Sequence, residues 1–255
     1  MEYSIFTPAD AYNQRIEMPP GRAIAGCAIG ILVLDVWYPY FPGNVSNASS
    51  YNFPVRHKVL KGATIEMIVR GDPALLNMIL EAGRELQQEG VRALVGACGY
   101  FSRYQQEVAA ALDIPVFLGS LLQVPMIHMA IKPNQKVGLL FGIGANVTRD
   151  MLEACGVTPD IPTVIMGMDD QPEFQNMVEG KGYLTFGRLE QQIVQRAQEM
   201  VMKNPDVGAI LLECSDMPPF SWAVQRAVKL PVFDYNTMIN WIYHGVVQRR
   251  YEGFL

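Results

Sequence analysis

The chain has 255 residues, of which 50% are hydrophobic and 18% are charged. This balance is typical of a globular protein with a large core, and it excludes a disordered chain. The net charge is −5, with no basic block beyond Arg249 and Arg250, so nothing favours nucleic acid or an anionic membrane as a partner. The longest apolar run, 23–34, is too short to span a bilayer. It follows a polar leader without signal-peptide character, so we expect a cytoplasmic protein whose four cysteines stay reduced.

Apolar runs rich in Val, Ile and Leu alternate with amphipathic stretches along the whole chain. The runs are continuous rather than alternating, which indicates parallel strands covered on both faces. Strands that alternate with helices predict an α/β fold with right-handed crossovers. In chain order we expect strands at 23–34 and 63–69, a helix at 73–89, a strand at 91–97, a helix at 103–112, a strand at 116–118, a helix at 121–131, a strand at 137–141, a helix at 146–154, a strand at 163–166, a helix at 183–203, a strand at 207–212, a helix at 219–228, a strand at 232–233 and a helix at 236–249.

Two segments stand out as connections. Residues 132–136 are polar, contain a proline and precede a new strand, as a domain boundary does. We therefore predict a first domain of residues 1–131 plus 235–255, the latter crossing back as a helix, and a second domain of residues 132–234. Segment 38–54 has neither helical nor strand periodicity. Its length and its content of Pro, Gly, Asn and Ser indicate a functional loop.

The chain contains two copies of one segment, residues 91–117 and 207–233. They align without a gap at an offset of 116 (214 − 98), which places Cys98 opposite Cys214. Each copy is a predicted strand, a cysteine at its C-terminal end and then a helix. Ligands of open α/β sheets bind at that end of the strands, and a helix N-terminus favours both a thiolate and a bound carboxylate. The repeat therefore predicts two thiols that face one substrate.

The sequence gives less reason to assign a catalytic role to the other candidate residues. Cys27 lies inside a predicted strand and Cys155 late in a helix, as structural cysteines do. The chain has no close Cys-x-x-Cys pair, no histidines at ligand spacing and no phosphate-binding glycine motif, so we expect no metal and no cofactor. Strand alternation points Glu213 away from Cys214, which favours a structural role. Asp216 fits two roles equally well, tuning of Cys214 or capping of the next helix.

The motifs around the two cysteines, GACG and LLECSD, resemble those of the aspartate/glutamate/hydantoin racemase superfamily. The resemblance continues in IGILVLDVWYPYFPGNVSN and VGLLFGIGANVT, and it covers about residues 23–244. It implies two pseudo-symmetric Rossmann-like (flavodoxin-like) domains with parallel sheets, an active site between them and chemistry without a cofactor. In such racemases one cysteine thiolate removes the α-proton while the other thiol reprotonates the opposite face.

The resemblance also implies which residues act. Cys98 and Cys214 would be the acid/base pair. A bulky Tyr-Phe pair follows Cys98 where glutamate racemases have an Asn/Thr setting, which predicts a reshaped pocket. The implied substrate-binding residues are Gly99, Tyr100, Ser215 and Asp216 beside the cysteines, Asp35, Asn44 and Asn47 on the first loop, and Gly144, Ala145 and Asn146 in the second domain.

We therefore expect a racemase or epimerase that acts on a small amino acid or a related carboxylate, and that assembles as a homo-oligomer. Other reactions on the same scaffold stay open: an arylmalonate-type decarboxylation, a maleate-type cis–trans isomerisation and hydantoin racemisation. A carboxylate-binding protein without catalysis and a redox pair of cysteines are the alternatives from other classes.

Overall fold

Two parallel four-stranded sheets form the framework of the computed structural model, which describes residues 12–13, 15–18 and 20–255. The first residues of the polar leader lie outside this description. The strand orders, β2-β1-β3-β4 and β6-β5-β7-β8, are the same arrangement repeated. The predicted α/β fold of two similar halves is therefore confirmed. The strands are β1 (Ile29–Leu34), β2 (Val55–Leu60), β3 (Ala93–Gly96), β4 (Val116–Phe117), β5 (Lys136–Phe141), β6 (Thr163–Gly167), β7 (Val207–Leu212) and β8 (Val232–Phe233).

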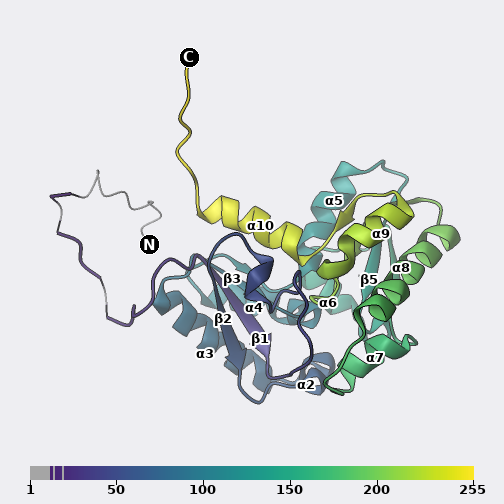
Figure 1. Cartoon of the computed structure of the whole chain (residues 1–255), viewed down its shortest axis with the longest axis horizontal. Coiled ribbons are helices and arrows are strands. Elements are labelled where there is room, and N and C mark those ends of the chain that lie inside the picture. Colours follow the sequence, from purple (N-terminus) through teal and green to yellow (C-terminus); the bar gives the residue numbers. More distant parts are fainter. Residues whose placement is uncertain (1–11, 14, 19) are drawn as a thin grey trace.

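Helices connect and cover the strands of both halves (Figure 1). Short 3₁₀ turns precede several of them, and two of these turns follow the cysteines. The α-helices are α2 (Ile65–Arg70), α3 (Ala74–Glu89), α4 (Gln105–Ala111), α5 (Val124–Ala130), α6 (Arg149–Ala154), α7 (Pro172–Val178), α8 (Phe186–Lys203), α9 (Ser221–Val228) and α10 (Tyr235–Val246). The 3₁₀ turns are η1 (Ala48–Ser50), η2 (Gly99–Tyr104), η3 (Ser120–Gln123), η4 (Gly144–Asn146) and η5 (Pro218–Phe220).

The core joins the two halves. One cluster of buried side chains contains Leu32 of β1 and Leu94 of β3 together with Leu139 and Phe141 of β5. The side chains that alternate with these on β5 and β7, such as Leu140, lie in a second cluster together with buried residues of α8. Because hydrophobic side chains of both sheets share one continuous cluster, the halves are held in a fixed relation to each other.

The last helix, α10, packs on the first sheet although it follows the second in sequence. Its buried residues Tyr235, Met238 and Ile239 share a cluster with Ile31 of β1 and Val95 of β3. In Figure 1 this helix (yellow) lies above the strands of the first half, and the C-terminal segment leads away from it. The division of the chain into residues 1–131 plus 235–255 and residues 132–234 stays a prediction.

One predicted element is wrong. The apolar run 63–69 is not a strand, because it becomes helix α2 between two strong capping signals. The side chain of Thr64 accepts a hydrogen bond from the N–H of Met67, and Gly71 ends the helix in the left-handed conformation with a φ of 69°. Capping chemistry therefore outweighs the β-propensity of the Ile and Val residues in this stretch.

Strand β2 was not predicted, because its sequence VRHKVL is half polar. It forms the edge of the first sheet, where polar side chains reach solvent. Two of them form ion pairs with α3: Arg56 with Glu89 at 2.6 Å, and Lys58 with Glu85. Helix α7 was also missed, and the strand expected at 23–34 begins only at Ile29.

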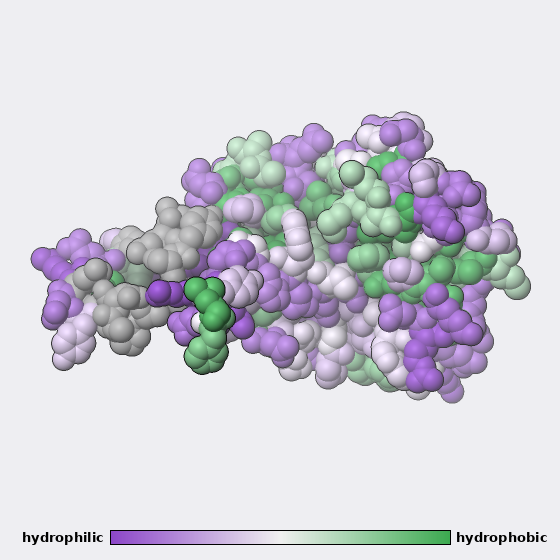
Figure 2. Space-filling model, turned by 90° about the horizontal axis from the view of Figure 1, so that it is seen from above, coloured by the Kyte–Doolittle hydropathy of each residue, from purple (hydrophilic) through white to green (hydrophobic). Residues whose placement is uncertain are grey.

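The molecular surface is mostly hydrophilic on the face seen from above, with hydrophobic patches between the polar side chains (Figure 2). Among the described residues, none of the helices combines the length and the apolar character needed to cross a bilayer.

Candidate active site

The two cysteines occupy equivalent places. Cys98 follows β3 and Cys214 follows β7, and these strands have the same position in their sheets. The carbonyl of Cys98 accepts a hydrogen bond from the N–H of Phe101, and that of Cys214 from the N–H of Met217, each at 3.1 Å. We call residues 98–101 and 214–217 the first and second cysteine turns. In both turns the sulfur accepts a hydrogen bond from the backbone N–H two residues later.

Both cysteine turns border one cavity between the halves. Its wall combines the two thiols with aromatic and aliphatic side chains, and Asp216 is its acidic group. None of the lining residues, all within the described chain, is Lys, Arg or His. They are Val33, Leu34, Val36, Tyr38, Tyr40, Ser46, Ile65, Ile68, Val69, Ala97, Cys98, Tyr100, Gly142, Ile143, Phe174, Met177, Val178, Cys214, Ser215 and Asp216.

The carboxylate of Asp216 is held by the predicted loop of the first half. Tyr38 donates a hydrogen bond to its Oδ1 at 3.0 Å, and the Nδ2 of Asn44 donates to the same atom at 2.5 Å. Its other oxygen, Oδ2, accepts from the Sγ of Cys214 at 3.4 Å. Asp216 therefore does not cap the following helix, the alternative its sequence position allowed. It forms a thiol–carboxylate dyad with Cys214.

Burial sets the protonation of the site. It raises the pKa of both thiols well above the ordinary value, and the neighbouring carboxyl of Asp216 adds to the effect at Cys214. The N–H groups that reach the two sulfurs oppose this rise. Burial also raises the pKa of Asp216, against the hydrogen bonds from Asn44, Tyr38 and Cys214. The free site thus holds protonated thiols, and Asp216 is placed to accept the proton of Cys214 when a thiolate forms.

Of the predicted binding residues, Tyr100, Ser215 and Asp216 line the cavity with the two cysteines. Tyr100 donates to the carbonyl of Ile143 and accepts from its N–H at 3.2 Å, so it joins the halves. Ser215 does the same by donating to the carbonyl of Ala97 at 3.0 Å. Both residues therefore shape the wall through contacts across the domain interface.

The three residues predicted on the first loop do not line the cavity, and each has a different role. Asn44 acts through Asp216, as described above. Asn47 lies outside the cavity lining: its Nδ2 donates to the carbonyl of Tyr40 at 2.8 Å, and its Oδ1 caps η1. Asp35 also lies outside the lining, where its Oδ2 accepts from the N–H of Gly62 at 2.9 Å. Asn47 and Asp35 thus hold the loops around the cavity.

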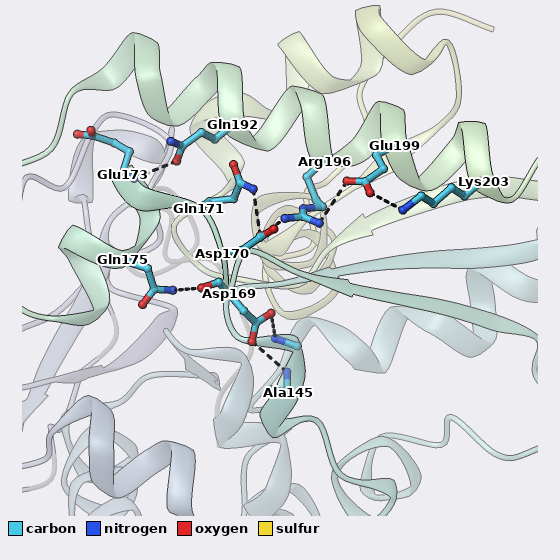
Figure 3. A network of polar contacts seen from close by, with 11 residues as sticks. Ala145, Asp169, Asp170, Gln171, Glu173, Gln175, Gln192, Arg196, Glu199 and Lys203 are labelled. Carbon is cyan, nitrogen blue, oxygen red and sulfur yellow. Dashed lines mark hydrogen bonds and ion pairs between the residues drawn. The ribbon is translucent and has the colours of Figure 1, made fainter.

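The predicted residues of the second domain, 144–146, also lie outside the lining. The N–H groups of Gly144 and Ala145 donate to the carboxylate of Asp169, at 2.9 and 3.1 Å. This contact belongs to a polar network on the loop after β6 (Figure 3), in which Arg196 of α8 joins Asp170 to Glu199. The N–H groups of Gly144 and Ala145 are therefore bonded within the second half.

Sequence reasoning missed the aromatic part of the wall. Tyr38 and Tyr40 lie with their ring centroids 4.6 Å apart, and Phe174 and Met177 come from the unpredicted helix α7. The available signal was the pair of tyrosines in the sequence WYPYFPG, at the start of the loop already predicted to be functional. In the described part of the chain no three His, Cys, Asp or Glu side chains are grouped to hold a metal ion.

Several solved structures share this architecture. Unliganded arylmalonate decarboxylase superposes with a TM-score of 0.53 at 16% identity, over 89% of this chain and 94% of that one. A glutamate racemase of Bacillus anthracis gives 0.53 at 14% identity over 86% and 82%, and the Picrophilus torridus aspartate racemase 0.52 at 16% identity over 89% and 96%. The chain thus has the fold of the aspartate/glutamate/hydantoin racemase superfamily, as the sequence predicted.

Sequence relatives place the chain more narrowly. A dimethylsulfoniopropionate lyase of Durusdinium sp. clade D is 30% identical over 251 residues, which are 94% of this chain and 82% of that protein. Dimethylsulfoniopropionate lyase 7 of Emiliania huxleyi is 31% identical over 223 residues, 84% of this chain and 65% of its own. No family model matches the chain. The chain belongs to the dimethylsulfoniopropionate lyase family, a family of enzymes whose named reaction is not racemisation.

Proposed function

We propose that this protein is a lyase that cleaves dimethylsulfoniopropionate or a closely similar sulfonium carboxylate. The observation that carries this proposal is the composition of the cavity wall. Two thiols face aromatic rings and one carboxylate, and no cationic side chain lines the described cavity. A dicarboxylate substrate, as a glutamate racemase takes, would bring a second negative charge with no cationic partner there. A substrate with a sulfonium group instead matches Asp216 and the aromatic rings.

The substrate has a carboxylate at one end and a dimethylsulfonium group at the other. Its sulfonium end would face Tyr38, Tyr40 and Asp216, where ring faces and a carboxylate attract a cation. Its carboxylate end would face the first cysteine turn, which leads into the 3₁₀ helix η2, whose N-terminus has no side-chain cap. This orientation brings the carbon next to the carboxylate close to the thiols.

The reaction is a β-elimination. Transfer of the Cys214 proton to Asp216 produces the thiolate, which removes the proton from the carbon beside the carboxylate. The electrons of that C–H bond form the carbon–carbon double bond. The C–S bond breaks and its electron pair leaves with sulfur. The products are acrylate and dimethyl sulfide. The abstracted proton restores the Cys214 thiol, and Asp216 releases the proton that it had accepted to solvent, which regenerates the free site.

The direct test is product analysis. The purified protein with dimethylsulfoniopropionate should release dimethyl sulfide, measured by gas chromatography, and acrylate in equal amount, measured by proton NMR. The uncharged thioether 3-(methylthio)propionate is the control, because it lacks the cationic leaving group and should stay intact. Absence of both products under conditions where the protein is folded would refute the lyase proposal.

A racemase or epimerase is the second candidate, because both thiols border the same cavity. Such an enzyme would exchange the α-proton of an amino acid or hydantoin for deuterium in D₂O without releasing sulfide. The same NMR measurement with a panel of these compounds distinguishes the two reactions.

Tyr40→Leu is expected to raise KM for the sulfonium substrate by about 5- to 30-fold, because a desolvated cation–π contact contributes roughly 1–2 kcal/mol. The substitution replaces the aromatic ring by a smaller apolar side chain and leaves the cysteine turns in place. kcat should change little. Competitive inhibition by 3-(methylthio)propionate, which carries no positive charge, serves as the control and should be unaffected. An equal loss of affinity for both compounds would show that Tyr40 acts by shape alone.

A further inference from the structure

Glu213 is a buried carboxyl group that the proposed reaction does not use. It follows β7, immediately before Cys214, and only 1% of its surface is exposed. Its backbone is fixed from both sides, since its N–H donates to the carbonyl of Leu140 at 2.9 Å and its carbonyl accepts from the Oγ of Ser120 at 3.1 Å. The side chain therefore leaves the strand end in a defined direction.

That direction is toward the first cysteine turn. A Cβ atom placed on Gly99 would lie 1.7 Å from the Oε1 of Glu213 and 2.1 Å from its Cδ. The carboxyl group thus occupies the space that any side chain at Gly99 would need. Glu213 begins beside Cys214 and ends against the residue after Cys98, so it fills the wall between the two cysteine turns. This position links the two turns through one side chain.

The Oε1 atom of Glu213 has no hydrogen-bond partner among the described residues. An ionised carboxylate in that position would be strongly disfavoured, while the neutral acid is tolerated. Burial accordingly raises the pKa of Glu213 to about 8. At neutral pH the group is therefore a carboxylic acid, and it gains a negative charge in mildly alkaline solution.

The groups around Glu213 would all respond to that charge in one direction. They are thiols and phenols, and a nearby negative charge raises the pKa of each. Asp216, the other carboxyl beside Cys214, acts on that thiol in the same sense. The groups that a charge on Glu213 affects are Cys98 and Tyr100 of the first cysteine turn, Cys155 after α6, Cys214 of the second turn and Tyr235 of α10.

We propose that Glu213 is a positioning residue that acts on both cysteines: as the neutral acid it fills the wall between the two cysteine turns, and as the anion it suppresses thiolate formation at Cys98 and Cys214. The proposal rests on the cysteine pair being the reactive pair, as in the proposed function. It does not depend on the identity of the substrate.

The test is alkylation of the individual cysteines by iodoacetamide as a function of pH, quantified by peptide mass spectrometry. In Glu213→Gln the uncharged amide keeps the shape of the acid and cannot ionise. Above pH 8 we expect Cys98 and Cys214 to react at least about threefold faster in this variant than in the unmodified protein, since a thiol pKa lowered by half a unit gives that factor. Below pH 7 the two proteins should react at the same rate.

Two controls isolate the charge. Cys27, a free cysteine that does not border the cavity, is the internal reference and should react alike in both proteins. Glu173→Gln is the matched variant, because Glu173 is also a buried glutamate of the second half but accepts a hydrogen bond from the N–H of Thr185. It should leave both pH profiles unchanged.

Two outcomes would overturn the proposal. One is an unchanged alkylation profile at both cysteines in folded Glu213→Gln. The other is a rate change of equal size at every pH, which would indicate only altered packing. Because the assay contains no substrate, either result leaves the lyase proposal untouched, and failure of the lyase assay leaves this one standing.

Discussion

Replacement of Cys214 by serine is expected to lower kcat for dimethylsulfoniopropionate by about 10³-fold, within the range of roughly 10²–10⁴ that a positioned general base contributes. The sulfur of Cys214 contacts the Oδ2 of Asp216 at 3.4 Å, so a proton acceptor for its thiol is already in place. Serine preserves the hydrogen bond but is a far weaker acid, so little alkoxide forms. KM should change little, because the aromatic wall stays intact.

Cys98→Ser is expected to be much milder, with a loss of about tenfold or less, because an elimination needs only one base and a general base accounts for most of the effect. Among the residues that the structure describes, no carboxylate forms a hydrogen bond to Cys98 like the one from Cys214 to Asp216. The two variants are compared by initial rates of dimethyl sulfide release at several substrate concentrations. Cys27→Ser, outside the cavity, is the control and should keep full activity.

The asymmetry between the two variants separates the candidate reactions. A two-base racemase would lose turnover to a similar, large extent in both serine variants. A lyase with one base loses it mainly in one. If Cys214→Ser retained full activity, the thiolate would not be the base, and Tyr100 or Asp216 would have to be considered in its place.

The arrangement of the sheets and the place of both cysteines could be predicted from the sequence because they rest on long-range repetition. The copies that contain Cys98 and Cys214 each encode a buried strand, a turn and a helix, and buried parallel strands leave a strong apolar signal. The edge strand β2 and helix α2 have apolar patterns that indicate their structure only weakly. Solvent exposure in β2 and capping by Thr64 in α2 decide those elements, and neither effect changes the apolar pattern.

The sequence indicates the fold more directly than it indicates a reaction. Racemases and a decarboxylase share this architecture, so the fold alone does not select one reaction. The proposal of a sulfonium substrate depends on Tyr38, Tyr40 and Asp216, which line the same cavity. Tyr38 and Asp216 are 178 positions apart in the sequence (216 − 38), and they meet only across the domain interface. The contact of Glu213 with Gly99 is likewise a product of the interface. Strand alternation correctly points this side chain away from its own cysteine but cannot show that it reaches the other turn.

The titration of Glu213 should make the free energy of unfolding depend on pH. Its pKa is raised from 4.5 to about 8 in the folded protein. A raised folded-state pKa means that the native protein binds the proton more tightly than the unfolded chain does. The stabilisation is therefore complete below about pH 4.5, and it is lost as the pH rises through 8.

Glu213→Gln removes the titratable carboxyl group from both the folded and the unfolded protein. Relative to the unmodified protein, its free energy of unfolding should rise by about 1.4 kcal/mol per pH unit within that window, and by about 2 kcal/mol between pH 6 and pH 8. Urea titrations at pH 6, 7 and 8 measure this difference, and comparison of the two proteins cancels the contributions of His57 and the other titrating groups. Glu173→Gln is again the control and should run parallel to the unmodified protein. Parallel curves for Glu213→Gln as well would mean that the carboxyl group is ionised in the native state, and that an unmatched charge is tolerated between the two cysteine turns.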